Sequence, residues 1–428
     1  MTVIGVTLAQ LHETLRFAVA EIPYYRERAD SYGAPVETLD ALQRLPFVTP
    51  EAFAADPRAF SSGVSWPEGT TFSSATTGDI GRSRWRSFDE LRAIRSFQEQ
   101  VGLEPATGVT LWIHAFDQGP PLLVPGSDNV ICVPFLVPWH FTYIRRLLED
   151  GWEGPTGHRR VERLVGFSPA LRILTVYLEE RGVVLEDFKI QSLEGFGSIQ
   201  PWIWRRRLAR SWGAPYQDLY GLSEVVGSEA RSCPVCGAYH FFQPIIAEVV
   251  DLVSGVQIRE GLGELILTEL TPYARLQLLI RYRTGDLVEI APRCMVSPFG
   301  IRFRGRLQHS VVIERDEAPP VAFGSLQIGE ICAELPDVAD EPVNWADWAA
   351  DVGPPRFHLA REAITVRVAV ELRYDPALHQ ARAASVRETL RRAMVRSIRS
   401  LDAGLEAGDL ELDLTTVNRG TLESITKL

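Results

Sequence analysis

Cysteine and histidine residues lie at the spacing of a metal site. Cys233 and Cys236 form a Cys-x-x-Cys run, and His240 follows four residues later. Two thiolates on a tight turn, an imidazole and one more thiolate complete a tetrahedral site for Zn²⁺. Cys294 is the best candidate for the fourth ligand. Four protein ligands leave no open position, so the pattern predicts a structural zinc site; free loop thiols or a redox pair are the alternatives.

A run rich in serine, threonine and glycine lies at residues 73–78. Hydroxyls and backbone N–H groups at a glycine turn can hold phosphate oxygens. Arg82 and Arg84 follow, and either of them can supply positive charge. Short runs of these residue types are also common in ordinary loops. The predicted phosphate contacts are Ser73, Ser74, Thr76, Thr77 and Gly78.

A second candidate run comprises Tyr220, Gly221, Ser223 and Glu224. A tyrosine can stack on adenine, while a hydroxyl and a carboxylate just beyond it can reach phosphate and Mg²⁺. The alternative is a strand end followed by a helix, because Ser223 is a plausible N-cap. Glu224 is accordingly the candidate magnesium ligand and a candidate catalytic residue.

Composition limits the class of protein. The 428 residues exceed the usual limit of a single core, which predicts one large domain and a smaller one. A net charge of −11 argues against a nucleic-acid partner, because phosphate neutralisation needs a positive surface. No apolar run reaches the about 20 residues that span a bilayer, and the first residues lack the pattern of a signal peptide. We therefore expect a cytoplasmic enzyme with no membrane association.

The pattern of apolar runs indicates how the chain is organised. Short apolar runs alternate with amphipathic helices up to about residue 242, which predicts an α/β architecture. Strand-like runs then dominate and predict a β-rich subdomain; they lie at residues 245–252, 263–268, 276–282 and 287–290. After Arg306 we expect a loop-rich stretch containing Pro319-Pro320 and Pro354-Pro355. A strand at 365–372, a helix at 379–401 and a strand at 410–416 then predict a small α+β domain.

Several motifs occur in an order that resembles a known superfamily. They are the run 282–287 (Tyr-Arg-Thr-Gly-Asp-Leu), the preceding run 263–268, the following run 303–306 (Phe-Arg-Gly-Arg), and the two loops described above. Together they resemble the adenylate-forming enzymes, and the phenylacetate–coenzyme A ligase branch most closely. The resemblance covers nearly the whole chain.

The resemblance implies a fold with a large N-terminal α/β domain, a β-rich subdomain and a small mobile C-terminal α+β domain. We set the large domain at 1–306, with the zinc subdomain at about 230–300, and the small domain at 307–428. Rotation of the small domain would switch the enzyme between two half-reactions.

The resemblance also implies roles for individual residues. Asp286 would accept hydrogen bonds from both ribose hydroxyls, and Arg306 would contact ribose or phosphate near the hinge as a catalytic residue. Gly197 and Ser198 resemble the adenine-contacting loop. Lys427 would contact the substrate carboxylate and the phosphate during adenylation.

A pocket for the acid is implied at Trp112, His114 and Phe116. Their residue types favour an aromatic acid as substrate. The alternative is that these side chains fill the edge of the core.

The implied reaction uses ATP and Mg²⁺ to activate a small-molecule carboxylic acid as its acyl-AMP. Coenzyme A would then displace AMP. The chain departs from the family pattern at Ala75, in the absence of a lysine after the phosphate loop, and at Gln308-His309. One alternative is therefore a different acid or acceptor, such as a carrier protein, or nitrite activation followed by diazotisation of an aryl amine. Another is a non-catalytic nucleotide-binding scaffold.

Overall fold

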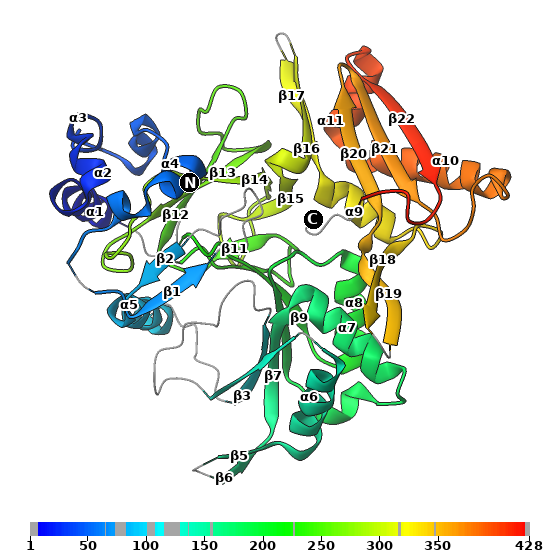
Figure 1. The fold of residues 1–428 in the computed structure, drawn as a ribbon. Coiled ribbons are helices and arrows are strands. Elements are labelled where there is room, and N and C mark those ends of the chain that lie inside the picture. The colour runs from blue at the N-terminus through cyan, green and yellow to red at the C-terminus, as the bar shows by residue number, and fades with distance from the viewer. Residues whose placement is uncertain are drawn as a thin grey trace.

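One long sheet runs through the larger part of the molecule (Figure 1). The computed structural model describes residues 7–64, 66–72, 83–100, 108–114, 129–135, 137–154, 157–225, 227–315, 318–345 and 348–423. The sheet has 11 strands in the order β12-β13-β14-β15-β11-β10-β9-β8-β7-β3-β4. One half is parallel and the other is antiparallel. The α/β class expected from the sequence is confirmed.

The parallel half comprises β3 (Val109–His114), β4 (Val130–Pro134), β7 (Val161–Phe167), β8 (Ser192–Phe196) and β9 (Tyr216–Tyr220). Its connections include the helices α6 (Pro138–Asp150), α7 (Ser168–Glu179) and α8 (Trp202–Trp212). Pro169 lies in the first turn of α7, where its missing N–H costs nothing. Residues of these elements share one hydrophobic core. Because all neighbouring strands here are parallel, their carboxyl ends lie along one edge of the sheet.

The antiparallel half comprises β10 (Ala230–Ser232), β11 (Tyr239–Phe241), β12 (Ile245–Val250), β13 (Leu262–Glu269), β14 (Tyr282–Ile290) and β15 (Ile301–Arg306). A second core joins these strands to the N-terminal helices α1 (Leu8–Glu21), α2 (Pro23–Arg26) and α3 (Ala29–Tyr32). The β-rich character expected after residue 242 is confirmed.

The strand expected at residues 276–282 is wrong. Up to Arg281 these residues are buried but do not join a strand ladder. Their backbone groups bond instead to other parts of the chain: the N–H of Leu279 donates to Glu269 Oε2 at 2.7 Å, and that of Ile280 to the Tyr25 hydroxyl at 2.9 Å. The run that begins at Tyr282 lies inside β14, where Gly285 has a φ of +73°.

The loop-rich stretch expected after Arg306 is also wrong. The chain there forms two hairpins separated by the helix α9 (Ser325–Ala333): β16 (Ser310–Arg315) with β17 (Ala318–Gly324), and β18 (Asp340–Trp345) with β19 (Trp348–Pro355). Two-stranded hairpins tolerate proline because many of their N–H groups do not enter a ladder. Proline therefore did not mark loops here.

The last elements agree with the sequence analysis apart from one break. A sheet of β20 (Phe357–Glu362), β21 (Thr365–Glu371) and β22 (Glu411–Val417) packs against α10 (Gln380–Ser397) and α11 (Arg399–Ala407). The single helix expected at 379–401 is two helices, divided at Ile398. A third hydrophobic core lies within residues 311–410.

The hairpin β18–β19 joins this last part to the larger one (Figure 1). Trp348 and Val352 are buried in the core of the parallel half. The Trp348 indole N–H donates to Glu180 Oε2 at 2.6 Å, and the buried Arg172 of α7 donates to the Gly353 carbonyl at 3.1 Å. The two parts are therefore packed together through a defined apolar and polar contact.

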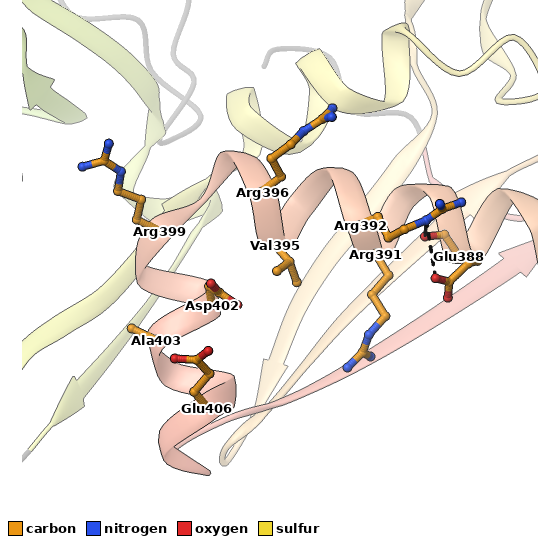
Figure 2. A pocket seen from close by; sticks show the side chains of 9 residues that line it. All are labelled: Glu388, Arg391, Arg392, Val395, Arg396, Arg399, Asp402, Ala403 and Glu406. Atoms are coloured by element: carbon orange, nitrogen blue, oxygen red, sulfur yellow. Dashed lines mark hydrogen bonds and ion pairs between the residues drawn. The ribbon is translucent and has the colours of Figure 1, made fainter.

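Shorter elements complete the described chain. They are α4 (Pro50–Ala55), α5 (Phe88–Gln100), the hairpins β1 (Gly69–Phe72) with β2 (Ser83–Arg86) and β5 (Trp152–Gly154) with β6 (Gly157–Arg159), and short 3₁₀ helices at Leu39–Arg44, Pro57–Phe60, Leu185–Phe188 and Leu307–His309. A surface cavity of about 500 Å³ lies along α10 and α11 (Figure 2). Among the described residues, no helix combines the length and the apolar character that crossing a membrane requires.

Candidate active site

The carboxyl edge of the parallel strands gathers three of the predicted runs. His114 ends β3, Phe196 ends β8 and Tyr220 ends β9. Gly197, directly after β8, has a φ of +82°, a conformation that favours glycine. In open α/β sheets, ligands bind at the carboxyl ends of the strands. The topology therefore brings residues that are far apart in sequence to the edge where a ligand site is expected.

Tyr220, Asp286 and Arg306 form a bonded cluster across β9, β14 and β15. The Tyr220 hydroxyl donates to Asp286 Oδ2 at 2.7 Å, and Arg306 Nε lies 3.2 Å from Asp286 Oδ1. The same arginine donates to the Thr284 carbonyl at 2.7 Å. Asp286 and Arg306 are direct partners in the β14–β15 register, so the strand pairing itself sets their proximity.

Burial and charge act in opposite directions at Asp286. The residue is 5% exposed. Burial raises its pKa, while Arg306 and the Tyr220 hydroxyl oppose that rise. Asp286 in turn raises the pKa of Arg306, so the guanidinium is charged. The carboxylate is thus held in a buried position by two directional partners.

One face of Tyr220 is already occupied. Its ring stacks on Phe303 of β15, with centroids 4.1 Å apart. Adenine stacking, as expected from the sequence, would have to use the opposite face of the ring. Phe303 is a neighbour that the sequence analysis did not assign to the site.

The turn after β9 brings Ser223 and Glu224 beside a buried arginine. Glu224 is buried, and the Ser223 hydroxyl lies 3.3 Å from Glu224 Oε2. Arg86 of β2 donates to the Ser223 carbonyl at 2.9 Å. Burial, followed by repulsion from Arg84, lowers the pKa of Arg86 to about 9. No helix starts at Ser223 within the residues described up to 225, so it is not an N-cap there.

Arg84 is one of the two arginines expected to supply positive charge to the phosphate loop at residues 73–78. Arg84 is fully buried and forms an ion pair with Glu269, 2.6 Å from Oε2. It is therefore a structural cation, and the expectation that it supplies charge to a phosphate is wrong. Arginines at every second position (82, 84 and 86) indicate that this segment supplies positive charge. Their spacing does not show which neighbour each side chain faces.

Two of the three residues expected to contact the acid, Trp112 and His114, belong to β3, and His114 is at its carboxyl end. Trp112 of β3 packs against Phe196 of β8, with ring centroids 5.5 Å apart. His114 is buried at the end of β3. Phe196 directly precedes the Gly197 turn, so Trp112 packs next to that turn; the acid pocket and the adenine loop stay predictions.

Three predicted elements lie outside the described residues. They are the phosphate loop with Ser73, Ser74, Thr76, Thr77 and Gly78, the acid-pocket residue Phe116, and Lys427. Arg82 also falls outside them. Their assignments stay predictions.

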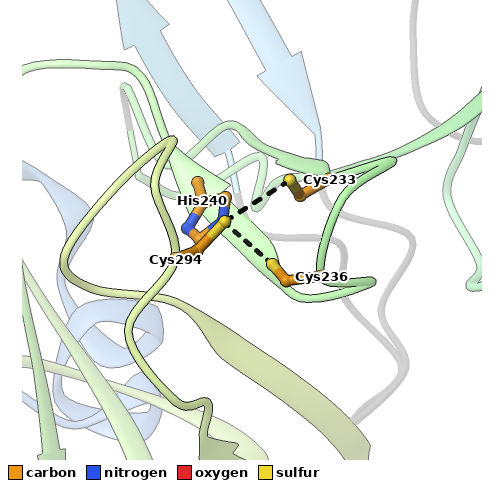
Figure 3. A group of neighbouring side chains, drawn as sticks. All are labelled: Cys233, Cys236, His240 and Cys294. Carbon is orange, nitrogen blue, oxygen red and sulfur yellow. Dashed lines mark hydrogen bonds between the residues drawn. The ribbon is translucent and has the colours of Figure 1, made fainter.

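The four predicted zinc ligands lie together (Figure 3). The ligand atoms of Cys233, Cys236, His240 and Cys294 are all within 4.8 Å of one another. The Sγ atoms of Cys233 and Cys294 are 4.0 Å apart, near the separation of about 3.8 Å between two thiolates on tetrahedral zinc. The donor set of three sulfurs and one nitrogen fits a structural zinc ion.

Residues around this cluster hold its side chains in positions that suit a metal ion. His240 Nδ1 lies 2.7 Å from the Phe299 carbonyl, which leaves Nε2 to face Cys236 at 3.3 Å. Gly300 permits this approach, because a Cβ there would lie 2.7 Å from the His240 ring. Gly237, with a φ of +69°, closes the turn between the Cys-x-x-Cys run and His240. A hydrogen bond from the Val296 N–H lowers the pKa of Cys294 to about 7.

Comparisons with known proteins show what the chain is similar to in sequence and in fold. No family model matches the chain. The phenylacetate–coenzyme A ligase of Aromatoleum evansii is 26% identical over 318 residues, which are 67% of this chain and 66% of that protein. The enzyme of the same name from Pseudomonas putida is 34% identical over 157 residues, 32% of this chain and 34% of that protein. The chain thus matches just under two thirds of the first relative's length and about one third of the second's.

Solved structures extend the similarity to nearly the whole chain. A 2-hydroxyisobutyryl-CoA ligase in the postadenylation state superimposes with a TM-score of 0.65, at 14% identity, over 98% of this chain and 87% of the other. The chain therefore shares the fold of this coenzyme A ligase. A benzoate CoA ligase from Burkholderia xenovorans LB400 shares it with a TM-score of 0.51, at 12% identity, over 86% of this chain and 69% of the other. The resemblance expected from the sequence is confirmed.

Within this ligase fold, Arg86 and Phe303 are the residues that the sequence analysis missed. Both lie against predicted site residues, Arg86 at Ser223 and Phe303 at Tyr220. Arg86 belongs to no motif, and Phe303, although it begins the motif 303–306, has no role of its own that the sequence shows. Only the folded geometry connects them to the site.

Proposed function

We propose that this chain is an AMP-forming ligase that activates a carboxylic acid, preferably an aromatic one, and transfers it to coenzyme A. The curated relatives named phenylacetate–coenzyme A ligase support the aromatic acid and the acceptor. The observation that carries the proposal is the Tyr220–Asp286–Arg306 cluster at the carboxyl edge of the sheet. A buried carboxylate with fixed partners is suited to accept hydrogen bonds from a ribose.

The proposed reaction has two steps. A carboxylate oxygen of the acid attacks the α-phosphorus of ATP, the bond to the bridging oxygen breaks, and pyrophosphate leaves. The coenzyme A thiolate then attacks the acyl carbon, AMP leaves with the bonding electrons, and the thiol proton passes to solvent. Positive groups near the transferring phosphate stabilise the charge that develops. Arg306, and Arg86 at the Ser223 carbonyl, are the described cations suited to that role.

The nucleotide contacts proposed for the described residues come from the ends of β8 and β9 and from the middle of β14. Asp286 would hold the ribose, Gly197 and Ser198 would line the adenine, and Tyr220, Gly221 and Ser223 would border the base and the phosphates. Glu224 would hold Mg²⁺, which supplies charge neutralisation when bound. Trp112 and His114, with Phe116, would form the acid pocket.

The composition of the chain supports a specific role for Lys427. Of the 44 basic residues, lysine occurs only at positions 189 and 427, and all others are arginine. Lysine offers a compact ammonium that can insert between a carboxylate and a phosphate, unlike the planar guanidinium. A lysine at 427 in a chain that otherwise uses arginine fits the proposed contact during adenylation.

The Cys/His cluster would hold a structural zinc ion. It joins the turn after β10 to the segment that follows β14. Because all four positions are protein ligands, the ion has no part in catalysis. It would stabilise the strands next to Asp286.

One assay tests the proposal and its alternatives. The protein is incubated with ATP, Mg²⁺ and a panel of aryl and aliphatic acids, with and without coenzyme A. Formation of AMP and an acyl-CoA from an aryl acid is the expected result. AMP formed only with nitrite and an aryl amine, or only with a carrier protein, would replace coenzyme A as the acceptor. Absence of AMP under every condition, together with no ATP binding, would favour the scaffold.

Two further expectations from the sequence keep the status of predictions. They are the division at residues 306 and 307 into a large domain and a small mobile domain, and the cytoplasmic location. Limited proteolysis and fractionation of cells that express the protein are the respective tests.

A further inference from the structure

Arg86 ends the strand β2 and contacts the segment that connects β9 to β10. In the sequence, β2 follows the run at 73–78 that is predicted to hold phosphate. Arg86 Nη2 donates to the Ser223 carbonyl at 2.9 Å. Ser228 holds the same segment, because its hydroxyl accepts a hydrogen bond from the Leu222 N–H at 2.8 Å. The guanidinium is therefore attached to a segment whose backbone is fixed by further hydrogen bonds.

The positive charge of Arg86 is buried without an ion pair of its own. The residue is 6% exposed, and no ion pair joins it to another described residue. Three carboxylates act on it through space, and each has other partners or another proposed role: Glu269 pairs with Arg84, Glu90 accepts backbone N–H groups, and Glu224 is the candidate magnesium ligand. A buried charge that lacks a directly bonded counter-charge is costly to the folded protein.

One end of the guanidinium is also unused. Nη1 of Arg86 is buried and has no hydrogen-bond partner among the described residues. Burial, followed by repulsion from Arg84, lowers the pKa of Arg86 to about 9. At Arg205 burial also lowers the pKa, but the charges around it, Asp218 first, more than reverse that effect. The comparison indicates that Arg86 lacks the anion that a buried arginine normally contacts.

Phosphate is the anion that this position favours. Tyr220 of the proposed ribose cluster precedes Ser223 by three residues, and the phosphates of a nucleotide are attached to its ribose. Trp112 and His114, the described residues of the proposed acid pocket, lie on β3, three strand positions from β9 in the sheet. At about 4.8 Å between neighbouring strands, that separation is roughly 14 Å. A contact at Ser223 is thus closer to the proposed ribose cluster than to the proposed acid pocket.

We propose that Arg86 is a phosphate-binding residue of the nucleotide site, in which Nη1 donates to a phosphate oxygen of ATP while Nη2 remains on the Ser223 carbonyl. The inference rests on the proposed ligase function and assigns this side chain a direct contact with the nucleotide. A planar guanidinium can donate to two different oxygen acceptors at once. The bound phosphate supplies the negative charge that the buried cation lacks.

Compounds that differ only in their phosphates test the proposal. Binding of adenosine, AMP and ATP to the wild type and to Arg86→Met is measured by equilibrium dialysis with Mg²⁺ present. ATP should bind about 10- to 100-fold more weakly to the variant, the scale of a hydrogen bond to a charged group, while adenosine should bind equally to both proteins. A loss shared by AMP supports a contact with the α-phosphate, and a loss confined to ATP supports a contact with the β- or γ-phosphate.

Arg172→Met is the matched control. Arg172 is also buried, donates to a backbone carbonyl, that of Gly353, at 3.1 Å, and has its pKa lowered by burial to about 10. It contacts β19 instead of the segment after β9, so its replacement should leave the ratio of ATP affinity to adenosine affinity unchanged. If Arg86→Met does not fold, Arg86→Lys is used, because lysine keeps the charge but lacks the planar fork, and the same comparison of ATP with adenosine decides.

Three results would overturn the proposal. Equal losses for adenosine and ATP would show that Arg86 only holds the backbone at Ser223. Unchanged ATP binding would show that Arg86 contacts no phosphate. A loss confined to the acid, seen as a raised KM for the acid at saturating ATP, would make Arg86 a contact for the carboxylate instead.

The failure of this proposal can be told apart from failure of the proposed function. If ATP binding depends on Arg86 as expected but no acid gives an adenylate, the ligase function fails and the phosphate contact stands. If acyl-CoA forms while Arg86→Met binds ATP as tightly as the wild type, the ligase function stands and the phosphate contact fails. A wild type that binds none of the three compounds would refute both.

Discussion

Strand β14 carries Asp286 of one cluster and leads to Cys294 of another. The two clusters differ in whether their polar atoms are all directed at one another. The Tyr220–Asp286–Arg306 cluster has one carboxylate with two partners and an arginine side chain that is 32% exposed. The cluster of Cys233, Cys236, His240 and Cys294 directs all of its ligand atoms toward one another. A cluster with an exposed arginine can exchange a contact within the protein for a contact with a ligand. A cluster whose ligand atoms all face one another can only stabilise the fold. The difference predicts that damage to the first affects catalysis and damage to the second affects stability.

The largest effect is expected at Asp286. Replacement by alanine removes the acceptor for both ribose hydroxyls and leaves Arg306 without its carboxylate. Hydrogen bonds to a charged group contribute about 1.5–3 kcal/mol each, so losing two should lower kcat/KM for ATP by about 150- to 25,000-fold. Steady-state kinetics measure this, with the exposed Asp187→Ala as control. An unchanged kcat/KM would remove Asp286 from the nucleotide site.

The Cys/His cluster should show the opposite behaviour. Cys236→Ser should abolish stoichiometric zinc and lower the melting temperature by several degrees, because metal binding contributes to folding. The turnover of the molecules that remain folded should change less than about 3-fold. Metal analysis and thermal denaturation provide the measurements. Cys132→Ser, at an exposed cysteine of β4, should change neither quantity; equal zinc content in the wild type and Cys236→Ser would contradict the metal site.

A second arginine–carboxylate pair, Arg84 with Glu269, shows the effect of complete burial on such a pair. Arg84 and Glu269 are both completely buried. Arg84→Met removes the cation from beside the buried Glu269 carboxylate and should cost about 3–5 kcal/mol of the free energy of unfolding. Arg259→Met, which breaks an exposed pair with Asp40, should cost at most about 1 kcal/mol. Denaturant titration compares the two; similar small losses would mean that burial does not distinguish these pairs.

The smallest effect concerns pH. Burial raises the pKa of Asp286, and Arg306 opposes that rise by favouring the carboxylate. Arg306→Met should therefore raise the pKa further, so the loss of ATP affinity on acidification should begin at a higher pH, by about one unit or more. ATP binding measured between pH 5 and 8 tests this. An acid limb that stays in place, or moves to lower pH, would contradict the coupling.

The sequence could predict the parts of these clusters that depend on residue chemistry. Cysteine and histidine at metal spacing, and the ordered runs around Asp286, carry their chemistry locally. The position of Arg84 could not be predicted, because nothing near it in the sequence shows that Glu269 lies opposite. The apolar run ending at Arg281 fits a strand equally well, yet its N–H groups bond to Tyr25 and Glu269. Long-range partners decided both cases.

The β18–β19 hairpin gives the molecule a preferred resting arrangement. Trp348 and Val352 are buried in the core of the parallel strands. Any other arrangement of the two parts would return these side chains to water, at a cost of about 3–6 kcal/mol for two buried apolar side chains. A ligand that favours such an arrangement must supply that difference through tighter binding. The apolar surface that Trp348 and Val352 bury would therefore set how tightly a substrate must bind before the two parts rearrange.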